Sequence, residues 1–139
     1  MLLVDSSVWI DQLRGNTTEA TRFIDARDAL EDLAITAVIY QEVLQGATSD
    51  RQFQRLRNML DAMPVLEPDS IATYAEAAGL YRAARTQGFT IRKSYDCLIA
   101  AIALEYGAVL VHNDRDFLAL NKVEPRLQVY PGSAESIRH

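Results

Sequence analysis

The sequence predicts an α/β fold with a mostly parallel central sheet of about five strands flanked by helices. Short apolar runs alternate with amphipathic segments, and strands that alternate with helices form parallel sheets covered on both faces. The 139 residues are 49% apolar and 24% charged, which is the composition of an ordinary globular domain. No repeat, linker or low-complexity tract divides the sequence, so we expect one domain over residues 1–139.

The chain begins with the pattern of a strand that leads into a helix. An apolar strand over 2–4 ends at Asp5, and the serines that follow can cap a helix. That helix is expected from Ser6 to about Gly15. A second amphipathic helix is expected over 18–30, because its apolar residues recur at helical spacing.

The next elements repeat the order of strand and helix. An apolar run over 33–35 predicts the second strand, and Thr36 can cap a helix that ends at Gly46. A further amphipathic helix is expected over 50–63. Pro64 ends it, because proline cannot continue the hydrogen bonding of a helix.

The middle of the chain predicts a short strand and a long helix. The strand is expected over 65–66. Asp69 or Ser70 can cap the helix, which Gly88 ends.

The last third contains the most apolar elements. A helix over 94–106 is hydrophobic nearly all round and should therefore be buried, and Gly107 ends it. A central strand is expected over 108–112, then a short helix that includes Phe117, and a final strand over 127–129.

Carboxylates follow these strands. Asp5 comes directly after the first strand, and Asp114 and Asp116 come after the central one. Glu42 lies near the start of the helix after the second strand, and Asp96 lies in the first turn of the apolar helix. Ligands of parallel sheets bind outside the carboxyl ends of the strands, so we expect these acids to meet at one edge.

Such a cluster of acids indicates a divalent cation. Carboxylates in one pocket raise one another's pKa unless a cation compensates their charge. Mg²⁺ and Mn²⁺ prefer oxygen ligands, and a zinc site is not supported because the histidines are only His112 and His139. A bound divalent ion can activate water and stabilise a leaving oxygen, which makes phosphodiester hydrolysis the natural reaction.

Each acid taken alone also has a plainer interpretation. Asp5 and Asp96 can be simple helix caps, and Glu42 can belong to a solvated helix face. Asp114 and Asp116 can form a polar turn followed by a cap. The joint arrangement favours the functional interpretation.

Four motifs carry a resemblance that covers nearly the whole chain. They are LVDSSVW from Leu3, QEVLQG from Gln41, YDCLIAA from Tyr95 and VHNDRDF from Val111. In this order and spacing they resemble the PIN-domain ribonucleases and, within that family, the VapC-type toxins of bacterial toxin–antitoxin pairs.

The resemblance implies a site, a reaction and partners. It implies a three-layer PIN-like fold in which Asp5, Glu42, Asp96 and Asp114 are catalytic and bind metal, and in which Asp116 is a further metal ligand. It also implies endoribonuclease activity with Mg²⁺, for which Mn²⁺ can substitute. The partners it implies are RNA, a second copy in a homodimer, and a cognate VapB-like antitoxin whose tail occupies the active-site groove.

Three residues near these acids are candidates for substrate binding. Ser7 can bond a carboxylate or a phosphate, and Arg92 can hold RNA phosphates. Arg115 can orient Asp114 or contact the scissile phosphate. The alternatives are backbone capping for Ser7 and a solvated surface for Arg92.

Two functions of other classes compete with RNA cleavage. A Mg²⁺-binding phosphoacceptor signalling domain also clusters Asp residues at strand ends. It needs an acceptor Asp after a central strand and a late Lys after another, and neither Asp69 nor Lys122 fits that pattern well. A PIN fold without catalysis could act only as a binding module, but the full set of acids argues against this.

The net charge of −5 speaks against binding to nucleic acid through bulk positive charge. Without the five acids of the expected site, 14 acidic residues remain against 14 Lys and Arg, so the excess can belong to a metal site. The single Cys97 and the lack of an export signal or of an apolar run long enough to span a bilayer predict a cytoplasmic protein without a membrane partner.

Overall fold

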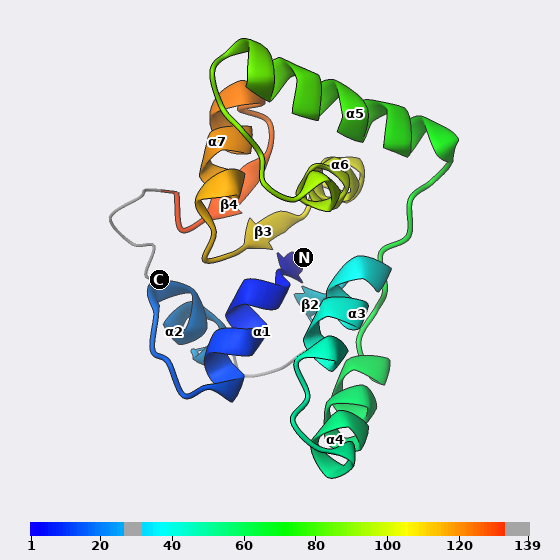
Figure 1. Cartoon of the computed structure of the whole chain (residues 1–139), viewed down its shortest axis with the longest axis vertical. Coiled ribbons are helices and arrows are strands. Elements are labelled where there is room, and N and C mark those ends of the chain that lie inside the picture. The colour runs from blue at the N-terminus through cyan, green and yellow to red at the C-terminus, as the bar shows by residue number, and fades with distance from the viewer. Residues whose placement is uncertain (27–31, 133–139) are drawn as a thin grey trace.

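The computed structural model of the chain describes residues 1–26 and 32–132 (Figure 1). In these ranges four strands form one parallel sheet of order β2-β1-β3-β4. They are β1 (Leu2–Val4), β2 (Leu33–Ala34), β3 (Val109–Val111) and β4 (Gln128–Tyr130). The predicted α/β fold with a parallel sheet is confirmed.

The strand predicted over 65–66 is reduced to one parallel bridge, between Ile35 and Val65. Ile35 N–H donates to the Pro64 carbonyl at 3.0 Å, and Leu66 N–H donates to the Ile35 carbonyl at 2.8 Å. Pro64 has no N–H to extend the ladder, and the side chain of Val65 is exposed. The sheet therefore ends at this edge.

Seven helices in the described part of the chain lie on the two sides of the sheet. They are α1 (Ser6–Leu13), α2 (Glu19–Asp25), α3 (Ala37–Gln45), α4 (Asp50–Asp61), α5 (Ile71–Thr86), α6 (Ser94–Tyr106) and α7 (Arg115–Val123). Helices α5, α6 and α7 lie on one side, with α5 packed against α6 and α7, and α1 to α4 lie on the other, with α4 packed against α3 (Figure 1). The end of the helix expected over 18–30, from Arg27 to Leu30, lies outside the described residues. Within the described ranges, none of the helices combines the length and the apolar character that a membrane crossing requires.

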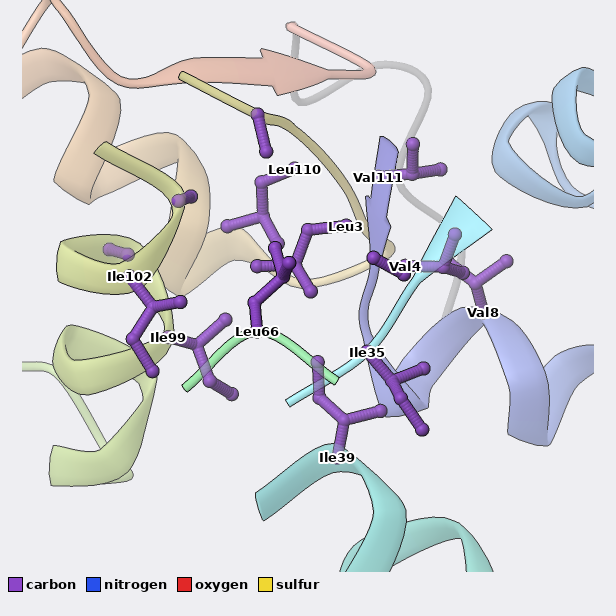
Figure 2. Packing of buried hydrophobic residues seen from close by; sticks show 14 of the residues in the cluster. Leu3, Val4, Val8, Ile35, Ile39, Leu66, Ile99, Ile102, Leu110 and Val111 are labelled. Atoms are coloured by element: carbon purple, nitrogen blue, oxygen red, sulfur yellow. The ribbon is translucent and has the colours of Figure 1, made fainter. Parts of the chain in front are cut away.

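The core lies on both faces of the central strands. Side chains alternate along a strand, so Leu3 and Leu110 lie on the side of Ile99, whereas Val4 lies on the side of Val8 (Figure 2). All five are fully buried. Helix α6 is buried along most of its length, as its apolar composition predicts.

The direction of the chain connections changes between β1 and β3, which lie side by side in the middle of the sheet. From β1 the chain moves outward to β2, and from β3 it moves outward to β4 in the opposite direction. Asp5 N–H donates to the Val111 carbonyl at 2.9 Å, so the two strands are still joined where the acidic residues begin. Such a switch point is where open α/β sheets bind their ligands.

Candidate metal centre

Three buried carboxylates converge beyond the end of β3. One oxygen from each of Asp96, Asp114 and Asp116 lies within 4.8 Å of the other two. Asp96 is in the first turn of α6, Asp114 caps α7, and Asp116 is in the first turn of α7. The positive ends of two helix dipoles therefore meet at these carboxylates.

Asp5 uses one carboxylate oxygen for structural contacts, while the other has no hydrogen-bond partner within the described ranges. Its Oδ2 accepts from the Ser7 N–H at 3.0 Å and from the Ser7 hydroxyl at 2.6 Å, which caps α1. The Ser7 hydroxyl also accepts from the Asn113 N–H at 3.0 Å. Ser7 thus joins the carboxylate after β1 to the loop after β3.

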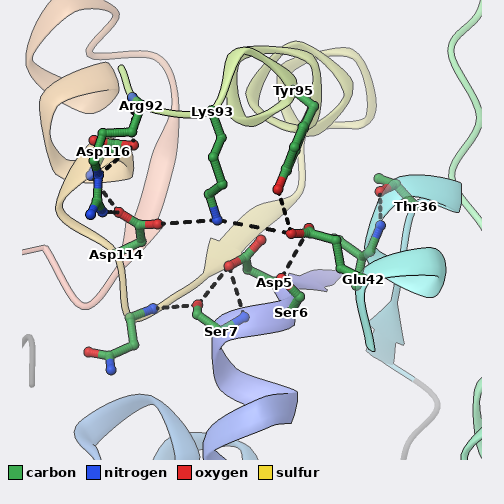
Figure 3. A network of polar contacts seen from close by, with 12 residues as sticks. Asp5, Ser6, Ser7, Thr36, Glu42, Arg92, Lys93, Tyr95, Asp114 and Asp116 are labelled. Atoms are coloured by element: carbon green, nitrogen blue, oxygen red, sulfur yellow. Dashed lines mark hydrogen bonds and ion pairs between the residues drawn. The ribbon is translucent and has the colours of Figure 1, made fainter. Parts of the chain in front are cut away.

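Glu42 reaches the same region from α3, which begins after the cap residue Thr36. Its Oε1 accepts from the Ser6 hydroxyl at 3.1 Å, and its Oε2 accepts from the Tyr95 hydroxyl at 2.8 Å. The side chains of Asp5 and Glu42 lie next to each other (Figure 3). Glu42 is therefore held by α1 and α6, and it is not part of a solvated helix face.

Two cations precede α6 and contact the acids (Figure 3). Lys93 Nζ lies 3.8 Å from Asp114 Oδ2 and 4.0 Å from Glu42 Oε2. Arg92 Nη2 lies 3.2 Å from Asp114 Oδ1, and the Arg92 N–H donates to Asp116 Oδ2 at 3.2 Å. The carboxylates of Asp114 and Asp116 raise the pKa of the Arg92 guanidinium. These contacts compensate part of the negative charge.

Burial, more than the remaining negative charge, raises the pKa values of three of the acids. Burial, and then the nearby Asp5, raises the pKa of Asp96 to about 8. Burial raises the pKa of Asp5 to about 6, although the bonds from Ser7 lower it. Burial and then Asp114 raise the pKa of Asp116. Burial lowers the pKa of Lys93, but the carboxylates around it, Asp96 first, outweigh this and raise that pKa overall.

The donor set fits a divalent cation. Both oxygens of Asp96 and Oδ1 of Asp5 are buried and have no hydrogen-bond partner among residues 1–26 and 32–132. A buried carboxylate oxygen without a partner is costly, and a cation would satisfy it. All the available donors are oxygens, which suits Mg²⁺ or Mn²⁺.

The structure thus brings all five acids expected from the sequence to one edge of the sheet, around Lys93. Asp5 and Asp114 also cap helices, so for these two residues the plainer interpretation is confirmed, and capping leaves a functional role open. Of the residues expected to bind substrate, Arg92 contacts the acids, and Ser7 bonds Asp5. Arg115 is exposed at the start of α7.

The sequence did not indicate a role for His112, Ser6 or Tyr95. His112 is fully buried, and its Nδ1 accepts from the Asp114 N–H at 3.0 Å. The proton of the neutral ring is therefore on Nε2, which lies 2.9 Å from the Pro131 carbonyl. Burial lowers the pKa of His112 to about 4, so the ring is neutral near pH 7. The one feature of the sequence that could have indicated this role is a histidine at the end of a strand, two residues before an aspartate.

Comparison of the sequence with known proteins gives consistent matches. The sequence model of the PIN domain matches residues 2–123. The chain is 35% identical over 127 residues to VapC ribonuclease Mb1587 of Mycobacterium bovis and to Ribonuclease VapC11 of Mycobacterium tuberculosis. The alignment covers 88% of this chain and 93% of each relative.

Solved structures show the same fold. FitAcB from Neisseria gonorrhoeae matches with a TM-score of 0.68 and 20% identity, over 95% of this chain and 98% of that one. VapBC-1 from nontypeable Haemophilus influenzae matches with a TM-score of 0.69 and 19% identity, over 92% of this chain and 95% of that one. At such identities the likeness concerns the fold alone.

Proposed function

The chain belongs to the PIN-domain family, and from this premise we propose that it is a metal-dependent endoribonuclease that acts as the toxin of a toxin–antitoxin pair. The observation that carries the proposal is the convergence of Asp96, Asp114 and Asp116, with both oxygens of Asp96 unpaired among the described residues. The ribonucleases to which the chain is 35% identical support RNA as the substrate.

In this proposal the acids hold the cation, with Mg²⁺ as the ion and Mn²⁺ as a substitute. Asp96, Asp114 and Asp116 supply the central ligands, and Asp5 and Glu42 complete the site from the other side of Lys93. These residues would hold the ion, which would supply an activated water for attack on the phosphorus and charge stabilisation for the leaving oxygen.

The neighbouring side chains orient these acids and bind the RNA. Ser7 holds one oxygen of Asp5 and leaves the other facing the site. The exposed guanidinium of Arg92 is placed to bind a phosphate oxygen next to the acids, since its side chain is 67% exposed. Arg115, at the start of α7, can contact another phosphate of the same RNA.

RNA cleavage by the purified chain tests the proposal. A 5′-labelled RNA should be cut in Mg²⁺ and left intact in EDTA, and Asp96→Asn should lower the rate by about 100-fold or more. Asp50→Asn is the matched control, because Asp50 is also in the first turn of a helix but is exposed and outside the cluster. Cleavage by Asp96→Asn at the wild-type rate would contradict the assignment.

The phosphoacceptor alternative is not favoured. It needs a lysine at the end of a strand near the acceptor, whereas Lys122 lies in α7 with its Nζ over the ring of Phe89. An inactive binding module is not favoured either. Both oxygens of Asp96 are buried and lack hydrogen-bond partners among the described residues, and such a carboxylate destabilises the fold unless a bound cation compensates its charge.

The partners and the compartment are part of the same proposal. The resemblance of the four motifs to the VapC-type toxins implies a homodimer and a cytoplasmic site of action. The matching VapBC-1 structure supports a VapB-like antitoxin as the partner. Expression of the chain alone should arrest growth, and co-expression of the small gene next to it should restore growth.

Light scattering should give the mass of two chains, and a mass of one chain would contradict the homodimer.

A further inference from the structure

A hollow lies directly beside the acidic cluster. It has a volume of about 460 Å³, within the range of roughly 300–1,000 Å³ in which proteins bind small ligands. Residues of the segment between α5 and α6 line one part of the hollow, and residues of α7 line another. Asp116 belongs both to this lining and to the three converging carboxylates. A ligand in the hollow would therefore lie next to the reacting phosphate.

The lining combines an apolar floor with a cationic rim. Phe89 packs against the hydrophobic core but is partly exposed, and Leu118 is largely buried. Arg115 and Lys122 are exposed at its edge. Among the described lining residues the one carboxylate is Asp116, so this hollow is more basic than the chain as a whole, whose net charge is −5.

These features match the parts of a nucleotide. Bases of single-stranded RNA stack on aromatic rings, and the phosphates bind Arg and Lys. Lys122 Nζ lies 5.9 Å from the centroid of the Phe89 ring. This contact is long and the lysine is exposed, so a base can replace it on the ring while the ammonium stays close to the following phosphate.

We propose that this hollow is a nucleotide subsite, in which Phe89 stacks the base of the RNA nucleotide next to the scissile phosphate. The inference deepens the proposed RNA cleavage and rests on it. It adds Phe89 and Lys122 to Arg115 as residues that position the substrate, outside the acidic centre. Recognition through stacking also explains how a chain with a negative net charge can select a single-stranded RNA.

Binding of a nucleotide that cannot be cleaved tests the subsite separately from catalysis. We compare adenosine 5′-monophosphate with ribose 5-phosphate in Mg²⁺, following backbone NMR shifts at Thr90 and Lys122. Both probes carry the same phosphate, so their difference reports the base. The wild-type chain should bind the nucleotide about 5-fold more tightly or better.

Two substitutions at Phe89 separate stacking from packing. Phe89→Leu keeps an apolar side chain of similar size and should abolish the preference for the nucleotide. Phe89→Tyr keeps an aromatic ring and should retain it. Equal binding of the two probes by the wild-type chain, or an unchanged preference in Phe89→Leu, would overturn the subsite.

A second measurement shows whether the subsite serves RNA or a free nucleotide. In an Asp96→Asn background, Phe89→Leu should weaken binding of a single-stranded RNA hexamer by about the same factor as binding of the mononucleotide. Unchanged hexamer binding would overturn the proposal. A nucleotide preference in a chain that cuts no RNA would contradict the proposed function alone, and normal cleavage without the preference would contradict the subsite alone.

Discussion

At the scale of single residues, Asp96 is a carboxylate whose ionisation is costly in the folded chain. It is fully buried, and its pKa is about 8, against 3.8 for an ordinary Asp. Between these two values the folded chain binds a proton that the unfolded chain has released. Stability contributed by this residue therefore falls as pH rises from about 4 to about 8.

Replacing Asp96 should remove this loss. In EDTA, Asp96→Asn should unfold at a higher temperature than the wild-type chain at pH 8, with a gain in unfolding free energy on the order of 1–4 kcal/mol. The difference should shrink toward pH 5, and Mg²⁺ should stabilise the wild-type chain more than the variant. Thermal unfolding across this pH range measures both effects, with Asp50→Asn as the unaffected control. A difference that grows as pH falls would contradict the account.

His112 should position Asp114 through a hydrogen bond. His112→Leu removes the acceptor of the buried Asp114 N–H, which should cost about 1–3 kcal/mol of stability and raise the Mg²⁺ concentration needed for cleavage. Trp9→Phe is the control, because it removes the buried bond from the indole N–H to the Val4 carbonyl without touching the acids. Metal titrations of cleavage compare the two variants, and an equal Mg²⁺ requirement in both would show that His112 has no positioning role.

At the scale of elements, helix α3 carries Glu42, and its first turn depends on a buried cap. The Thr36 hydroxyl accepts from the Ile39 N–H at 3.2 Å. Thr36→Val should therefore lower stability by about 1 kcal/mol and also weaken cleavage, because the helix that holds Glu42 frays. Ser70→Ala removes the exposed cap of α5 and should affect stability alone. Chemical denaturation measures stability, and RNA cleavage rates measure activity. Equal cleavage rates in the two variants would show that the cap of α3 does not affect the site.

Local sequence patterns predict a helix or strand well where composition or a single residue such as glycine determines its burial or its end. Helix α6 is apolar nearly all round and is buried, and Gly107 ends it in the left-handed conformation, with φ of 62°. The strand expected over 65–66 is only a bridge, because pairing at an edge depends on a neighbouring strand, which local sequence does not specify.

In the site, too, the sequence predicts the positions that depend on local patterns and misses the contacts between distant residues. The positions of Asp5 and Asp114 follow from strands that end next to each other, so the sequence suffices to place them at one edge. The bond from Tyr95 to Glu42 joins residues 53 positions apart. No periodicity connects two such residues, and only the tertiary structure, which places Tyr95 at the start of α6 within hydrogen-bond distance of Glu42 in α3, reveals the contact.

At the scale of the whole molecule, local cations offset the negative net charge where RNA would bind. Arg92 and Lys93 lie at the acids, and Arg115 and Lys122 lie at the adjoining hollow. RNA binding should accordingly be weak without Mg²⁺ and should depend on these few side chains.

Salt titrations test this distribution of charge. Arg92→Ala should weaken binding of single-stranded RNA and reduce the slope of log affinity against log salt by about 0.7, the value expected for one phosphate contact. Arg57→Ala is the control, because Arg57 lies on α4 in an exposed pair with Asp61. Fluorescence anisotropy of a labelled RNA gives both slopes. The same slope for the Arg92 variant as for the wild-type chain would rule out a phosphate contact at Arg92.

The position of a bound metal ion tests the central claim most directly. Crystals grown with Mn²⁺ should show an anomalous peak coordinated by oxygens of Asp96, Asp114 and Asp116, and Asp96→Asn crystals should lose that peak. A well-ordered wild-type crystal with these carboxylates unliganded at millimolar Mn²⁺, or with the ion bound elsewhere, would contradict the account.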